Sequence, residues 1–218
     1  MVADRAGGTI RSFVAVELAG AARSELQTYL DALRGIGGVA WTRPENLHVT
    51  LKFLGSAVRD RLERLGPRLA EVAAARPRFT ITCAGVGAFP SLARPRVLWV
   101  GADARPLAAL AADVDAACAA EGFVPEARPF HAHCTLGRVR AAGAGHGRDR
   151  RAGTRHATAL HDLLDRLGAE RAPVFGVSPA SALVLFRSDT RADGARYTAL
   201  ATFPFGRDSH DANRGEFG

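Results

Sequence analysis

Lysine, cysteine and long apolar runs are scarce in this sequence of 218 residues. Lys52 is the only lysine, so arginine carries almost all of the positive charge. No apolar run is long enough to cross a bilayer, and residues 1–8 lack the basic-then-apolar order of a secretory signal. These absences argue against a helical membrane protein and against a secreted one.

The cysteines are three in number and widely spaced, at Cys83, Cys118 and Cys134. An odd, scattered set fits neither a disulfide framework nor a zinc knuckle. We therefore expect reduced thiols in a cytoplasmic protein.

The composition is that of a globular protein with a basic balance. Hydrophobic residues make up 47% of the chain, the formal charge is +7 and the sequence pI is about 10.5. A basic balance favours polyanionic partners such as nucleic acid. A bias towards arginine, alanine and glycine gives the same balance without any such partner, and we weight the two explanations equally.

Hydrophobic periodicity predicts mixed strands and helices. Strands are expected at 10–18, 39–42, 47–54, 79–83, 97–100, 130–139, 182–187 and 197–205. Helices are expected at 21–33, 60–75, 106–120 and 159–167. Because these elements mix without a strict βαβ alternation, the predicted fold class is α+β. We expect one domain over 10–206, a loop at 141–155, and flexible ends at 1–9 and 207–218.

One motif occurs twice. The segment RPENLHVTL at 43–51 and the segment RPFHAHCTL at 128–136 share R-P-x-x-x-H-x-T-L, with five identities at identical spacing. A repeat of this kind indicates two related lobes. Because side chains alternate along a strand, His48 and Thr50 point to one face, as do His133 and Thr135. If a pseudo-twofold relates the lobes, the two polar faces meet across one cleft.

Two imidazoles and two hydroxyls around a shared ligand suit phosphoryl transfer by paired general acid and base. The unperturbed pKa of histidine, about 6.5, suits either role, and threonine hydroxyls can donate to non-bridging phosphate oxygens. A single histidine on a strand is more often structural than catalytic. For the matched pair of histidines we favour the catalytic role. A zinc site is the weaker alternative, because no Cys, Asp or Glu shares the polar face.

Three further residues are candidates for substrate binding. Lys52 shares strand parity with His48 and would reach a phosphate, unless it is a surface lysine. Arg138 follows the second motif by the offset at which Phe53 follows the first. Arg138 would clamp a phosphate and Phe53 would stack on a base, although an apolar strand residue is more often part of the core.

At these residues the sequence resembles the 2H phosphoesterase superfamily, and more closely the RNA 2',3'-cyclic phosphodiesterases once called 2'-5' RNA ligases. The resemblance extends over 10–205 and includes RSFVAVEL, WTRPENLHVTLKFLG, GVGAFPSLARPRVLWVG, RPFHAHCTLGRVR and LVLFRSDTRADGARYTALATFPF. It implies a bilobal α+β fold of two pseudo-twofold-related lobes, each with an antiparallel sheet and flanking helices.

The resemblance also implies an activity. Family members open a 2',3'-cyclic phosphate on RNA or a nucleotide to leave a 2'-phosphate, without a cofactor, and some join 2'-5' linkages in reverse. By motif position, His48 would protonate the departing 3' oxygen and His133 would activate water. Thr50 and Thr135 would hold the phosphate. The residues themselves are symmetric and do not choose between acid and base.

Two features leave alternatives open. The arginines of the 141–155 loop would either follow an RNA backbone or belong to a solvated insertion, which we favour. The intact motif pair favours an enzyme over a non-catalytic module that binds RNA ends, and 2'-5' ligation would use the same groups in reverse. We expect a monomer that acts on RNA with 2',3'-cyclic phosphate ends or on cyclic nucleotides, away from membranes.

Overall fold

The structure is a computed structural model that describes residues 8–140, 162–164, 173–191 and 194–206. Its strands are β1 (Thr9–Glu17), β2 (Val39–Trp41), β3 (His48–Val58), β4 (Phe79–Phe89), β5 (Val97–Asp103), β6 (His133–Val139), β7 (Val174–Ala180), β8 (Ala182–Arg191) and β9 (Gly194–Pro204). Its helices are α1 (Gly20–Leu33), α2 (Arg59–Ala74) and α3 (Leu107–Ala120), with a 3-10 turn, η1 (Pro44–Asn46), before β3.

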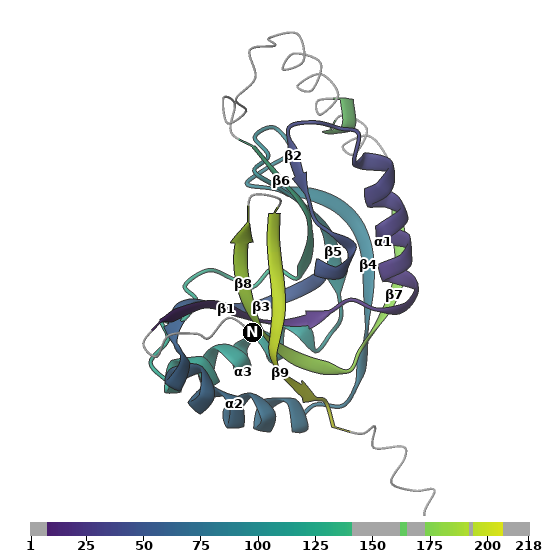
Figure 1. Ribbon diagram of the computed structural model, residues 1–218. Coiled ribbons are helices and arrows are strands. Elements are labelled where there is room, and N and C mark those ends of the chain that lie inside the picture. The colour runs from purple at the N-terminus through teal and green to yellow at the C-terminus, as the bar shows by residue number, and fades with distance from the viewer. Residues whose placement is uncertain (1–7, 141–161, 165–172, 192–193, 207–218) are drawn as a thin grey trace, which may run out of the picture.

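The strands form one antiparallel sheet of nine strands in the order β7-β4-β5-β6-β3-β1-β8-β9, with β2 paired to β6. The order divides at the β6–β3 pair into two halves of four strands. Figure 1 shows this sheet curling around itself. The α+β class and the two related halves predicted from the repeat are thus confirmed, and the halves meet at the two strands that carry the motifs.

The helices cover the outer surface of the sheet. Helix α1 packs on β7, whereas α2 and α3 pack on each other and against strands of the other half (Figure 1). Each helix turns a leucine-rich stripe inward, as the periodicity predicts. For α2 the stripe is Leu62, Leu65, Leu69 and Ala73. The main core therefore lies between the helices and the sheet.

A second, smaller cluster lies on the other face of the sheet. It contains Phe13, Ala15, Val184 and Phe186, with Tyr197 packed against it. Strands β1, β8 and β9 supply these side chains. This aromatic cluster forms the surface beside the first motif.

Most expected elements are present, and several strands are longer than expected. Strand β7 was not expected; its sequence VFGVSPA contains a glycine and a proline, which weaken the strand pattern. The expected loop at 141–155 and the end at 207–218 lie outside the described residues, and the expected end at 1–9 is described only from residue 8. Of the helix expected at 159–167, only 162–164 are described, as helix.

Candidate active site

The two motifs lie side by side on the central strand pair. Val49 of β3 is the antiparallel partner of Cys134 of β6, and both side chains are fully buried on the core face. Residues directly opposite each other in an antiparallel pair point to the same face. Continuing the register therefore places each histidine beside the threonine of the other motif, on the face away from the core. The pairs are His48 with Thr135, and His133 with Thr50.

Both imidazoles are held in the same tautomer. Nδ1 of His48 lies 2.6 Å from the carbonyl oxygen of Asn46, and Nδ1 of His133 lies 2.7 Å from that of His131. A carbonyl oxygen only accepts, so each Nδ1 carries a hydrogen and donates it. Nε2 is then the atom that exchanges a proton in either ring. Nε2 of His48 also lies 3.1 Å from Oγ1 of Thr50.

Both imidazoles are favoured in the neutral form. Burial lowers the pKa of His48 to about 4, against a weaker opposing effect of the Asn46 carbonyl, and the charge of His133 lowers it further. Burial also lowers the pKa of His133, and the charges of His131 and Arg138 act in the same direction. Both shifts favour the neutral imidazole at neutral pH.

Aromatic side chains cause much of this desolvation. The His48 ring stacks on Phe13 at a centroid distance of 4.9 Å and meets Tyr197 edge-on at 5.3 Å. On the other half of the sheet, the His133 ring meets Phe89 edge-on at 5.0 Å. Trp99 lies nearby, with its ring 4.9 Å from that of His131. The sequence alone does not predict these aromatic neighbours, because single aromatic residues on strands are more often part of the core.

A β-bulge follows the threonine in both motif strands. Along β3, Thr50 pairs with Ala15 and Lys52 with Val14, so that Leu51 is the extra residue. Leu136 is the extra residue in the same position of β6. A bulge reverses the alternation of side chains beyond it. Residues after the bulge therefore face opposite to what simple alternation predicts.

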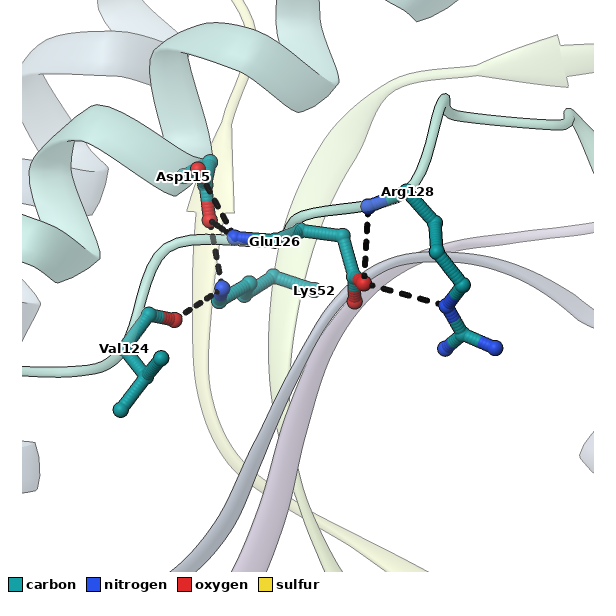
Figure 2. Close-up of polar contacts among 5 residues, drawn as sticks. All are labelled: Lys52, Asp115, Val124, Glu126 and Arg128. Atoms are coloured by element: carbon teal, nitrogen blue, oxygen red, sulfur yellow. Dashed lines mark hydrogen bonds and ion pairs between the residues drawn. The ribbon is translucent and has the colours of Figure 1, made fainter.

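The predicted parity of Lys52 is wrong for this reason. The bulge at Leu51 turns Lys52 to the core face, where it is only 4% exposed. Its Nζ forms an ion pair with Asp115 of α3 at 2.5 Å (Figure 2). Lys52 therefore does not reach the cleft or a phosphate bound there.

The same bulges bring Phe53 and Arg138 to the histidine face. Phe53 is 58% exposed, and its ring lies 6.1 Å from Phe13 in the cluster beside His48. Arg138 is also exposed, and its charge influences the pKa values of both His133 and Tyr197. One exposed aromatic ring and one guanidinium thus occupy equivalent positions in the two halves.

A small pocket adjoins His48. Its volume is about 210 Å³, and its walls include Phe186, Tyr197 and Glu17. Asn46, which also lines it, donates from its side chain to the carbonyl of Ala195 at 2.9 Å and so ties the first motif to β9. Within the described ranges, no three His, Cys, Asp or Glu side chains are grouped to hold a metal ion. No helix in those ranges is long and apolar enough to span a membrane.

The fold is that of a class of phosphoesterases, as comparisons with known proteins show. A family model described as LigT-like phosphoesterase matches residues 16–99. An Archaeoglobus fulgidus protein named RNA 2',3'-cyclic phosphodiesterase is 41% identical over 60% of this chain and 73% of its own length. A protein of the same name from Methanothermobacter thermautotrophicus is 30% identical over 89% of this chain and 98% of its own. The chain belongs to this family, the LigT-like RNA 2',3'-cyclic phosphodiesterases.

Solved structures share the fold. A crystal structure from Thermus thermophilus superposes with a TM-score of 0.71 at 25% identity, covering 91% of this chain and all of that one. E. coli LigT in its apo form gives a TM-score of 0.67 at 24% identity, covering 92% of this chain and all of that one. The likeness therefore extends over both halves of the sheet.

Proposed function

We propose that the protein hydrolyses 2',3'-cyclic phosphates of RNA or nucleotides to 2'-phosphates, with His48 and His133 as the acid–base pair. The observation that carries this proposal is the placement of two imidazoles, in one tautomer, beside two threonines on adjacent strands. The names of the relatives support the same substrate class.

The proposed reaction is an in-line attack of water on phosphorus. Nε2 of His133 takes a proton from the water as its oxygen bonds to phosphorus. The bond from phosphorus to the 3' oxygen breaks, and Nε2 of His48 gives that oxygen a proton. Thr50 and Thr135 donate hydrogen bonds to the non-bridging oxygens, where charge accumulates. The choice of His48 as the acid rests on the family resemblance.

The lowered pKa values make the protonation of the histidine pair sensitive to a bound anion. A neutral His133 is ready to act as a base, but His48 needs a proton before it can act as an acid. The charge of a bound phosphodiester favours the imidazolium. Substrate binding would therefore raise the pKa of His48 and favour its protonated, acidic form. The pH optimum of kcat would then lie above that of kcat/KM.

Phe53 and Arg138 are proposed to hold the nucleotide, Phe53 by stacking on a base and Arg138 by contacting the phosphate. Replacing Arg138 with Ala should raise KM and lower kcat/KM by about tenfold to hundredfold, because a charge-assisted hydrogen bond is lost. Phe53→Ala should act mainly on KM, at a cost of roughly 1–3 kcal/mol in binding. Initial-rate kinetics separate the two effects, and unchanged kinetics in both variants would contradict the placement.

The decisive test is incubation with a 2',3'-cyclic nucleotide in EDTA, followed by assignment of the product. We expect a 2'-phosphate from the wild type, and almost none after His48→Ala or His133→Ala. A 3'-phosphate would contradict the direction of ring opening. An intact cyclic phosphate after long incubation would instead support a module that only binds RNA ends.

We further propose that the protein works as a monomer in the cytoplasm. Both motifs and both aromatic walls come from one chain, so that the site needs no second copy. The three cysteines are free and buried, as suits a reducing compartment. Light scattering at several protein concentrations tests the first point, and fractionation of the source cells tests the second.

A further inference from the structure

Lys52 is buried in the core, where it forms an ion pair and a hydrogen bond. Nζ of Lys52 is paired with Oδ1 of Asp115 at 2.5 Å and donates to the carbonyl oxygen of Val124 at 2.6 Å (Figure 2). Removing a cation from water is costly unless it is paired and hydrogen-bonded. Every other basic residue of the chain, histidine aside, is an arginine. The compact ammonium of lysine donates to both acceptors from one nitrogen atom. The guanidinium of arginine is larger and planar, and so would not fit the same two acceptors in this way.

Asp115 extends this contact to the segment that leads into the second motif. Its two carboxylate oxygens accept from the backbone N–H of Glu126, at 3.1 and 3.3 Å. The carboxylate of Glu126 in turn accepts from the backbone N–H of Arg128 at 3.4 Å and from its Nε at 3.3 Å (Figure 2). Residues 123–132 contain no helix or strand. Backbone hydrogen bonds join the two ends of the segment to its neighbours, from the N–H of Phe123 to the carbonyl of Cys118 and from the N–H of Ala102 to the carbonyl of Ala132. The side-chain contacts add to these bonds in the middle of the segment.

The network therefore joins β3, which carries His48, to the segment 123–132, which leads to His133. Lys52 lies two residues after Thr50 on β3, and the segment it holds ends at His133, the first residue of β6. We infer that Lys52 and Asp115 are positioning residues, which hold the segment before His133 in place relative to β3 and so fix His133 relative to His48. The kinetic consequences of this inference rest on the proposed function. The positioning of His133 by the network does not depend on that function.

The first test is kinetic and uses Lys52→Met, which keeps the length of the side chain and removes its charge. We expect kcat to fall by about tenfold to hundredfold, because a small misplacement of a catalytic group has that effect. KM should change by no more than about threefold, since Lys52 touches no substrate. Asp115→Asn should act in the same direction, and the double variant should be little worse than Lys52→Met, because both changes break one network.

Two controls separate positioning from loss of charge and loss of stability. Arg34→Met removes an exposed cation from an ion pair with Asp31 on α1, and neither residue belongs to a motif or to the Lys52–Asp115 network. Leu69→Ala opens a cavity under α2, where Leu69 is fully buried. With all variants assayed well below their melting temperatures, both controls should keep the kcat of the wild type.

The second test does not depend on turnover. Ring resonances of 15N-labelled histidine should shift for His133 in Lys52→Met and stay in place in Arg34→Met and Leu69→Ala. An unmoved His133 signal together with a kcat within about twofold of the wild type would overturn the inference. A raised KM with kcat retained would overturn it in favour of direct substrate contact. If the wild type itself turned over no cyclic nucleotide, the proposed function would fail, while the resonances would still decide the positioning role.

Discussion

At the scale of single residues, the two histidines differ more in their surroundings than in their own bonds. Each donates from Nδ1 to the carbonyl two residues earlier. The His48 ring, however, is stacked on Phe13 and closed by Tyr197, and the pKa of His48 is lowered to about 4 mainly by burial. Sequence reasoning found both rings and the threonine beside each, because the repeat is visible in the letters. It missed the desolvation, because the walls come from strands distant in sequence.

The lowered pKa of His48 makes stability depend on pH. In the unfolded chain the imidazole takes up a proton near pH 6.5, whereas in the folded protein it does so near pH 4. The unfolded state thus binds more protons in this interval, and stability falls as the pH falls from 6.5 to 4. The loss attributable to His48 is at most about 3 kcal/mol. His48→Gln should flatten that part of the profile in urea unfolding measured across this range. Parallel profiles for wild type and variant would contradict the burial of a neutral ring.

At the scale of elements, the bulges decide which side chains reach the site. The prediction for Lys52 assumed uninterrupted alternation, and a bulge at Leu51 reverses it. Phe53 and Arg138 each lie five residues after a motif histidine. Uninterrupted alternation would therefore place both side chains on the core face. Their shared offset was nevertheless a sound signal, because both strands bulge at the equivalent residue. A bulge is set by pairing with neighbouring strands, which local sequence does not reveal.

Close packing between β4 and β5 supports the second histidine. A Cβ added at Gly87 would overlap the indole ring of Trp99, which pairs with Thr135 across β5 and β6. Gly87→Ala should therefore push the ring towards His131 and cost about 1–3 kcal/mol in unfolding free energy. Activity should fall as well, because the wall beside the second motif moves.

Gly35→Ala is the matched control for that substitution, because a Cβ at Gly35 meets no atom within 4 Å. It should change the unfolding free energy by no more than about 0.5 kcal/mol. Thermal unfolding and initial rates, measured on both variants, compare the two positions. Equal stability and activity of the two variants would show that the indole ring has room to move.

At the scale of the whole molecule, the symmetry of the sheet explains why sequence and geometry leave the acid and the base undecided. The strand order reads as two equivalent halves that meet at β3 and β6, and each half supplies one histidine. The repeat predicted two related halves, whereas the direct pairing of the two motif strands is seen only in the structure. What breaks the symmetry is the guanidinium of Arg138 on one side and the ring of Phe53 on the other, together with the tighter burial of His48.

A sulfur substitution in the substrate resolves the two roles. In a 2',3'-cyclic phosphorothiolate with sulfur in place of the 3' oxygen, the leaving thiolate needs no proton, so a missing general acid costs little. If His48 is the acid, His48→Ala should recover most of its lost rate on this substrate, while His133→Ala should stay inactive because water still needs a base. Single-turnover rates of both variants on the oxygen and sulfur substrates provide the comparison. Recovery by His133→Ala instead would exchange the two roles and leave the paired-histidine site intact, whereas recovery by neither would mean that bond breaking is not limited by protonation of the leaving group.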